Sequence, residues 1–229
     1  LYVGTYLDVD GTTNLDNSDI DGTLVVDGSN ISLDSTTTLN IDNSNTSNGI
    51  TIGTATSGVP ISIGHGTSET TINDNLTVTG NLNVSGTVTK PNQPAFLVTA
   101  QEKLNIPLHS HVQMLFTTEI FDQDSNFASS TFTAPVTGRY QLQVNLDMRQ
   151  VDTSASYYIF RLHTSNRIYY QLIDPGDSGM YDINYYPFAI TMLTDMDASD
   201  TAIVTIYQSY GTQLTDMDAN SFFSGYLVA

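Results

Sequence analysis

The sequence contains no cysteine and no tryptophan, and only six of its 229 residues are lysine or arginine. Without cysteine the chain can form neither a disulfide nor a thiolate metal site. With a formal net charge of -18, it has no basic patch to attract nucleic acid phosphates or an anionic membrane. No apolar run approaches the roughly 20 residues of a membrane-spanning helix. We therefore exclude nucleic acid partners and membrane insertion.

Basic and large aromatic residues are absent from one part of the chain. Residues 1–89 contain ten acidic residues but no lysine, arginine or phenylalanine, and all nine phenylalanines and eleven of the thirteen tyrosines follow. Pro91 and Pro94 lie between the two parts, where they would end a strand ladder and stiffen a connection. We therefore predict a domain at 1–89, a linker at 90–95 and a second domain at 96–229. Because the chain begins with Leu1, we expect a fragment or a processed product.

The first part consists of short apolar segments that alternate with polar residues. Alternation with a period of two predicts strands, and the Asp, Asn, Gly and Ser residues between the segments predict turns. The spacing is irregular but repetitive, which indicates a repeat architecture. The segments occupy residues 24–26, 31–33, 39–41, 50–52, 59–63, 76–78 and 82–84.

One copy of residues 1–89 has too little apolar surface to order itself. Each segment has two or three aliphatic side chains, and burying each contributes about 1.5 to 3 kcal/mol. Ordering the backbone costs about 1 to 2 kcal/mol per residue. Three chains wound about one axis would share a thin core and leave no open sheet edge. A disordered polar tract and a single-chain β-solenoid are the alternatives.

The stretch "NLTVTGNLNVSGTVT", residues 75–89, resembles the shaft repeats of bacteriophage tail and head fibres. The resemblance extends over roughly residues 5–89. It implies an intertwined trimeric β-structure, and we call residues 1–89 the shaft.

The second part alternates over longer and more aromatic segments and contains no convincing helix. An antiparallel all-β sandwich of eight or more strands follows from this pattern. The expected strands lie within 111–121, 130–135, 139–148, 156–164, 167–173, 188–193, 201–210 and 221–229.

Two stretches of this part, "FDQDSNFASSTFTAPVTGRYQLQVNL" and the terminal "SFFSGYLVA", resemble the globular head of complement component q subunits and tumour-necrosis-factor-like proteins. "PAFLVTA" at 94–100 resembles the opening strand of that family. The resemblance implies a ten-strand jelly roll that trimerises about a three-fold axis. The spacing from Phe127 to Phe132 is shorter than usual, and Leu142 and Val144 replace commoner aromatics. The matching positions, expected to be structural, are Phe121, Phe127, Phe132, Gly138, Tyr140, Phe223, Gly225 and Tyr226.

The residues alone also support packing roles. Phe132 and Tyr140 flank the turn "APVTG" and can both point into one core. Gly225 removes a side chain where a neighbour approaches closely. Because the shaft needs copies and the head resembles a trimeric family, we predict a homotrimer in which the second part forms a head.

No catalytic constellation is present, and we predict that the protein is not an enzyme. Of the four histidines, His109 and His111 form a His-x-His pair. In an extended strand both imidazoles would point to one side, so three chains could supply six nitrogens to an axial metal ion. Related phage fibres use His-x-His in this way. The alternative is a surface loop.

Acidic residues raise the question of calcium. Asp122 and Asp124 alternate in "DQDSN" like the start of an oxygen-ligand loop, although the glycine and distal glutamate of an EF-hand are missing. "LTDMDA" occurs twice and contributes Asp195, Asp197, Asp216 and Asp218. In the complement-like family an acid and a tyrosine near the axis can hold calcium, which implies Asp177, Tyr181 and Asp182 here. At each of these sites the alternative is that the acidic side chains are solvated surface charges. We expect that the protein requires no cofactor.

The same predicted loop, "DPGDSGMYDINYY", contains Tyr181, Tyr185 and Tyr186 beside glycines and acids. Exposed tyrosine among polar residues is common in recognition surfaces. We predict that these tyrosines contact a receptor or glycan, with core packing as the alternative for the adjacent pair.

The preferred hypothesis is a virion fibre that faces outward from a tail or capsid. Other virion proteins would hold the shaft end, and the trimeric head would bind a host surface receptor or glycan with gains from multivalency. The alternatives are a purely structural or capsid-decorating trimer and a secreted complement-like recognition trimer. The lack of a visible signal peptide and of a collagen-like stalk counts against the last.

Overall fold

The computed structural model describes residues 35, 38, 39, 41, 47, 50, 52, 60–64, 66, 69–176 and 181–229. The chain divides into two compact units, Leu1–Gly80 and Asn81–Ala229. The shaft strands predicted at 24–26 and 31–33 lie outside the described residues, and those at 39–41, 50–52 and 59–63 are described only in part. Within the described ranges, no helix has the length and apolar character needed to cross a membrane.

Residues 69–94 form no strand in the single chain, although strands are predicted at 76–78 and 82–84. Leu76, Val78 and Leu82 are 62%, 42% and 67% exposed. These aliphatic side chains face solvent in the single chain, and the strands predicted for three wound chains do not form in one copy. The trimeric shaft stays a prediction.

The predicted linker contacts the head at its start. Lys90 and Gln93 close a turn through a backbone hydrogen bond of 3.1 Å. The Gln123 side chain donates hydrogen bonds to the carbonyls of Lys90 and Pro91, at 2.9 and 2.6 Å. Residues 90–93 are thus fixed to the sandwich.

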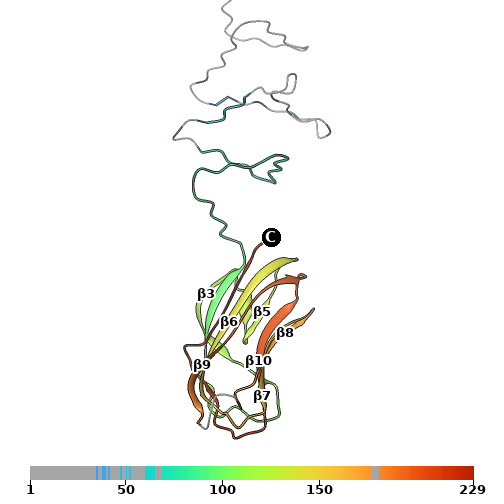
Figure 1. Ribbon diagram of the computed structural model, residues 1–229. Coiled ribbons are helices and arrows are strands. Elements are labelled where there is room, and N and C mark those ends of the chain that lie inside the picture. Colours follow the sequence, from blue (N-terminus) through green and yellow to red (C-terminus); the bar gives the residue numbers. More distant parts are fainter. Residues whose placement is uncertain are drawn as a thin grey trace, which may run out of the picture. The chain divides into compact units, whose positions relative to one another are not determined.

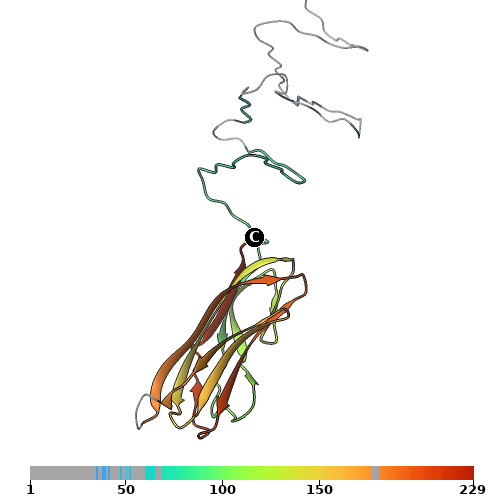
Figure 2. The same ribbon diagram turned by 45° about the vertical axis from the view of Figure 1, so that its right-hand side comes forward.

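Twelve strands follow within the described residues, all antiparallel where they pair within a sheet (Figures 1 and 2). This number exceeds the expected ten, and three of the strands, β2, β4 and β11, contain only two residues each. The strands are β1 (Ala95–Ala100), β2 (Val112–Gln113), β3 (Phe116–Gln123), β4 (Phe127–Ala128), β5 (Thr131–Thr133), β6 (Gly138–Val151), β7 (Tyr157–Thr164), β8 (Ile168–Ile173), β9 (Ile183–Met196), β10 (Thr201–Ser209), β11 (Asp216–Met217) and β12 (Phe222–Leu227).

The strands form two six-stranded sheets. The first sheet has the order β11-β6-β12-β1-β3, with β9 paired to the other side of β6. The second has the order β4-β5-β10-β7-β8, with β2 paired to β10. Figures 1 and 2 show the two layers face to face. The all-β antiparallel sandwich predicted from the sequence is confirmed.

Aromatic side chains from both sheets fill the space between the layers. Phe96 of β1 stacks on Phe127 and Phe132, with ring centroids 5.1 and 4.7 Å apart, and meets Phe223 edge-on at 4.9 Å. Tyr140 packs against Phe132 at 5.4 Å. These five side chains are at most 5% exposed, so they form one continuous core.

Two glycines allow close approach at the edges of this core. A Cβ atom at Gly225 would lie 2.5 Å from Leu142 Cδ2 and 2.8 Å from Phe96 Cε1. At Gly138 it would lie 2.7 Å from the Ala229 carbonyl oxygen. Any larger residue at these positions requires the neighbours to move.

Phe121 is not a core residue, contrary to the prediction. It lies opposite Leu97 in the β1–β3 pairing, next to a register shift between Leu97 and Val98. Buried Phe96 and Val98 flank Leu97, so Phe121 shares its outward side and is 49% exposed. A bulge of this kind reverses which side a residue faces.

Candidate functional site

The three tyrosines predicted to contact a receptor do not all lie in a loop. Tyr185 and Tyr186 belong to β9, which begins at Ile183, and only Tyr181 precedes it. Tyr181 and Tyr185 are 82% and 69% exposed. Tyr186 is partly covered and meets Phe188 edge-on, with ring centroids 5.8 Å apart. Two of the three tyrosines are therefore free to contact a ligand.

Arg149 of β6 lies beside these tyrosines and is held by an acid. Its guanidinium carbon is 5.9 Å from the Tyr185 ring centroid, which permits a cation–π contact. The same guanidinium forms an ion pair with Asp218. The cation near Tyr185 is therefore already neutralised within the protein.

Two of the predicted calcium ligands, Asp122 and Asp182, already accept hydrogen bonds from the protein. Asp182 accepts the Thr153 backbone N–H at 3.1 Å, whereas Asp177 lies outside the described residues. Asp122 accepts the N–H groups of Asn126 and Phe127 at 3.0 and 2.9 Å. Asp122 thus closes its own loop.

Asp124 has a left-handed backbone, with φ of 74°, and accepts a hydrogen bond from the Asn126 side-chain amide at 3.4 Å. Within the described residues, no group of three or more His, Asp or Glu side chains is arranged to hold a metal ion. The residues of "DQDSN" therefore form and stabilise a turn in this chain.

His109 and His111 do not form the predicted extended pair. His109 has φ of 57° and its ring meets Tyr210 edge-on, with centroids 4.8 Å apart. His111 packs on Tyr207 at 4.9 Å. Each imidazole contacts a different tyrosine, and the turn between them removes the geometry on which the axial metal prediction depended.

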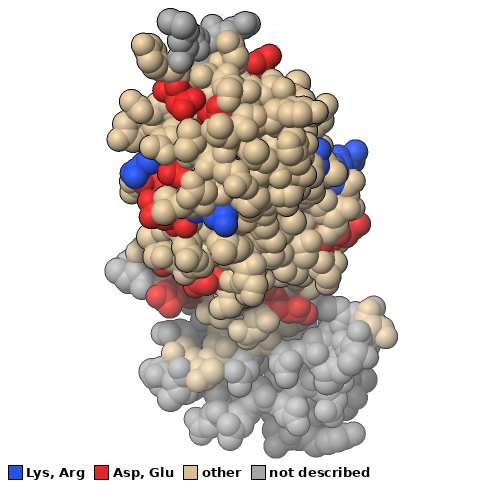
Figure 3. Space-filling model, turned by 90° about the horizontal axis from the view of Figure 1, so that it is seen from below, with Lys and Arg blue, Asp and Glu red and all other residues tan. Residues whose placement is uncertain are grey.

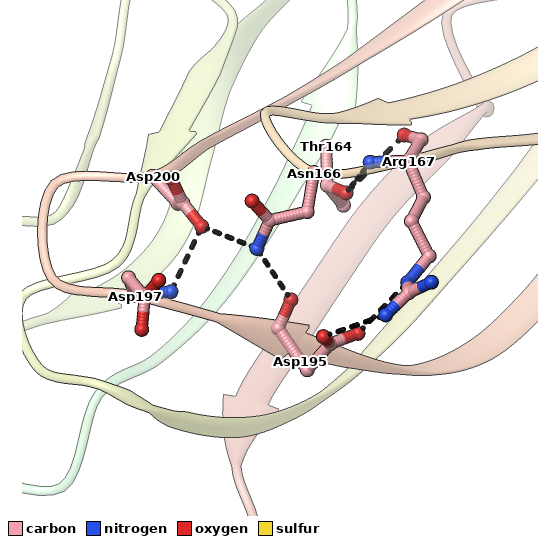
Figure 4. Close-up of polar contacts among 6 residues, drawn as sticks. All are labelled: Thr164, Asn166, Arg167, Asp195, Asp197 and Asp200. Atoms are coloured by element: carbon pink, nitrogen blue, oxygen red, sulfur yellow. Dashed lines mark hydrogen bonds and ion pairs between the residues drawn. The ribbon is translucent and has the colours of Figure 1, made fainter.

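The acids of the first "LTDMDA" copy join two turns of the sandwich (Figure 4). Arg167 donates two hydrogen bonds to the Asp195 carboxylate, at 3.1 and 2.9 Å, and they lower the pKa of Asp195. Asp200 accepts the Asn166 amide and the Asp197 N–H, both at 2.8 Å. These contacts connect the β7–β8 turn to the β9–β10 turn.

The acids of the second copy are also engaged. Asp216 accepts the Asn105 N–H at 2.7 Å, and buried Asp218 pairs with Arg149. Both copies of "LTDMDA" therefore have structural partners.

A buried polar cluster lies where β6 ends. Asp152 is 1% exposed and accepts hydrogen bonds from the backbone and side chains of Ser154 and Thr212. Burial alone would raise the pKa of Asp152, but these hydrogen bonds outweigh it and the pKa is lowered. The Tyr158 hydroxyl lies 2.6 Å from Thr215 Oγ1 in the same cluster. The cluster connects the β6–β7 turn to the segment after β10.

The outer surface of the first sheet carries no charge across its centre. Buried residues alternate with outward ones on four adjacent strands, β9, β6, β12 and β1. The outward rows of β6 and β9 include Arg139, Asp147 and Asp195 toward the strand ends, and we call the outward residues between them and on the neighbouring strands the uncharged face. It comprises Ala95, Leu97, Thr99, Gln141, Gln143, Asn145, Ala189, Thr191, Leu193, Phe222, Ser224 and Tyr226.

The outer surface of the second sheet has a basic residue, and the strands of this sheet contain no acidic residue. None of the strands β2, β4, β5, β7, β8 and β10 contains an aspartate or glutamate, whereas the chain has 24 such residues. The outward residues include one arginine, two histidines and three tyrosines. We call this set the Arg161 face: His111, Tyr157, Ile159, Arg161, His163, Ile168, Tyr170, Leu172, Ile203, Thr205 and Tyr207.

The end of the sandwich opposite the C-terminus is different again. Figure 3 shows acidic side chains there in several separate groups, with few basic ones among a mostly uncharged surface.

A cavity of about 490 Å³ is lined by Lys90–Pro94, Pro135, Val136 and the C-terminal residues Leu227–Ala229. Its lining contains one lysine and one aspartate, Asp124, and no arrangement suited to acid–base chemistry.

The sequence interpretation missed the Arg161 face. The signal was present, because "SYYIFRLHT", "RIYYQLI" and "TAIVTIYQSY" contain no acid in a strongly acidic chain. Each stretch was interpreted only as a strand. Their juxtaposition on one surface depends on the β8-β7-β10 order, which alternation alone does not determine.

Among known proteins, solved structures resemble part of this chain at low identity. No family model matches the sequence, and no curated protein matches it. The globular domain of zebrafish complement 1qA protein is 15% identical with a TM-score of 0.45, covering 60% of this chain and 98% of that chain. A crystal structure of murine APRIL at pH 8.0 is 8% identical with a TM-score of 0.43, covering 59% and 99%. At these identities the likeness concerns the fold alone.

Proposed function

We propose that this chain is a virion fibre protein that assembles as a homotrimer and binds a host surface receptor through its head. The shaft end contacts other virion proteins, and the head faces outward. The protein acts by binding and has no catalytic activity. The resemblance of residues 75–89 to phage shaft repeats supports the viral origin.

The observation that carries the proposal is the uncharged face. A chain with net charge -18 repels its own copies, and burying a carboxylate at an interface is costly. At the centre of four adjacent strands the outward residues are nevertheless uncharged, among them Leu97, Phe222 and Tyr226, and the charged outward residues lie toward the strand ends. Copies can approach through this face without desolvating a charge. Closed symmetry about one axis then yields a finite assembly.

The exposed shaft residues support the same assembly. Leu76, Leu82 and Val88 are each at least 60% exposed in the single chain. Burial against two further copies would remove this apolar surface from water, at about 25 cal/mol per Å². Shaft and head therefore both gain stability from additional copies.

Three heads on one fibre would increase attachment strength. Linked sites can gain about 100- to 10,000-fold in avidity when geometry allows simultaneous engagement. Tyr181 and Tyr185, at the end away from the C-terminus, are candidates for the host contact.

Adsorption competition tests the proposal. Purified full chain is added to bacteria before virions that carry the same protein, and residual adsorption is counted. The proposal predicts saturable inhibition. Undiminished adsorption, with the chain bound to particles but not to cells, would contradict receptor binding.

That second result would favour a purely structural fibre. The uncharged face supports this candidate as well, since a head that only aligns and locks three chains needs the same surface. In that case binding to intact cells is absent, whereas removal of the head prevents shaft assembly.

A further inference from the structure

Arg161 is a cation without an anion. Its Nε atom is buried and has no hydrogen-bond partner. No hydrogen bond or ion pair of this side chain occurs among the described residues. Two of the other three arginines form ion pairs, Arg149 with Asp218 and Arg167 with Asp195. A guanidinium held in place without a carboxylate is an available anion site.

The surroundings of Arg161 are aromatic and uncharged. In the strand register it lies between Tyr170 of β8 and Thr205 of β10. Two residues away along β7, His163 Nε2 lies 3.0 Å from Thr205 Oγ1. Burial, and then the charge of Arg161, lowers the pKa of both His163 and His111. Arg161 is therefore the fixed positive charge of the face at neutral pH.

Aromatic rings flank this charge on both sides. Tyr170 is 64% exposed on β8. On β10, the ring of partly exposed Tyr207 lies 6.1 Å from that of Tyr157 and 4.9 Å from that of His111, as centroid distances. The face thus combines exposed and partly exposed rings, hydroxyl and imidazole hydrogen-bonding groups, and one guanidinium.

We propose that the Arg161 face binds a carboxylate-bearing saccharide, with Arg161 holding the carboxylate and Tyr170 and Tyr207 contacting the sugar rings. A guanidinium fork matches a carboxylate in a bidentate arrangement. Tyrosine supplies rigid amphipathic surface for the remainder of the ligand. This proposal names the class of ligand that the head would bind in attachment. It rests on the proposed attachment function only for the biological source of the saccharide.

Charge density argues for a saccharide rather than a dense polyanion. The chain carries net charge -18, so a polymer with closely spaced charges is repelled before it reaches a single arginine. Duplex nucleic acid carries about one charge per 1.7 Å. A polysaccharide with one carboxylate per repeat unit places an isolated anion at Arg161 and uncharged sugar on the rings.

The test uses the full chain on an array of carboxylate-bearing bacterial polysaccharides, each paired with its carboxyl-reduced derivative. We expect at least one acidic member to bind and its reduced partner not to bind. Arg161→Gln should weaken that binding about ten- to a hundredfold, the size of one lost charge-assisted hydrogen bond. Arg139→Gln, the same change on the exposed start of β6, is the matched control and should leave it unchanged.

Tyr170→Ala provides a second variant at an exposed position, and should also weaken binding while the melting temperature is retained. The proposal is overturned if no acidic polysaccharide is preferred over its reduced partner, if only phosphate-bearing or acidic peptide probes bind, or if Arg161→Gln binds like the unchanged chain. Adsorption competition distinguishes the two proposals. Inhibition by the unchanged chain without saccharide binding would remove this inference and leave the attachment function standing. Arg161-dependent saccharide binding without inhibition of adsorption would remove the attachment function and leave this inference standing.

Discussion

The backbone N–H of Asp152 donates a hydrogen bond to the Tyr158 hydroxyl, 2.9 Å away, at a point where both residues are buried. Tyr158 Oη also lies 2.6 Å from Thr215 Oγ1. One hydroxyl therefore satisfies groups from the end of β6 and from the segment after β10. Two predictions concern this cluster.

Tyr158→Phe should lower the free energy of unfolding by about 1 to 3 kcal/mol, because the buried Asp152 N–H and the buried Thr215 hydroxyl each lose one of their partners. Burial, the main cause, raises the pKa of Tyr158 to about 12. A raised acid pKa means that its stabilising effect is present below pH 10 and is lost as the pH rises toward 12. Denaturant titrations at pH 7 and pH 11 should show this alkaline loss in the unchanged protein and a smaller one in the variant. Equal losses would contradict this role for Tyr158.

Asp152→Asn should destabilise the protein at neutral pH and flatten its acid dependence. The lowered pKa of Asp152 means that its carboxylate stabilises the fold above the unfolded-state value, which is about 3.9 for aspartate. That contribution is lost as the pH falls through the folded pKa. Thermal unfolding between pH 3 and pH 7 measures the effect. A variant with the same pH profile as the unchanged chain would assign the acid dependence to other carboxylates.

Gly225→Ala should destabilise the head by about 1 to 3 kcal/mol, the usual cost of overpacking a core. Its Cβ would lie within 2.8 Å of carbon atoms of both Leu142 and Phe96. Gly86→Ala is the matched control, because no atom lies within 4 Å of the corresponding Cβ position. Chemical denaturation of both variants compares them directly. Similar stabilities would mean that Leu142 and Phe96 can move apart at little cost.

Ser224→Asp should separate the proposed trimer of the head. Ser224 lies on β12 at the centre of the uncharged face, between Gln143 and Leu97 in the register. Three copies would each bury a carboxylate there, and buried unpaired charges are strongly unfavourable. Gln171→Glu, on the exposed edge strand β8, should leave the assembly intact. Sedimentation velocity distinguishes the two variants, and an unchanged sedimentation coefficient for Ser224→Asp would place the interface elsewhere.

Much of the head could be predicted from alternation alone. The buried rows of β6 and β7 follow the period of two that the sequence displays, from Tyr140 to Met148 and from Tyr158 to Thr164. The role of Gly225 was also evident from its place in an aromatic strand. These features depend on local pattern, which one sequence contains in full.

Features that depend on register or on cross-strand neighbours could not be predicted. The bulge beside Leu97 exposes Phe121, and nothing in "EIFDQD" indicates a register shift. β9 begins at Ile183, earlier than the predicted 188–193, and includes Pro187; β9 is an edge strand, where a missing N–H is tolerated. Likewise, nothing in "PLHSHV" indicates the left-handed backbone of His109 or its ring contact with Tyr210.

The mass of the full chain in solution tests the central claim most directly. Multi-angle light scattering at micromolar concentration should report three times the 24.9 kDa of one chain, because both the exposed shaft side chains and the uncharged face need further copies to cover them. A mass of 24.9 kDa, with the shaft residues protected from hydrogen exchange in that single chain, would contradict it.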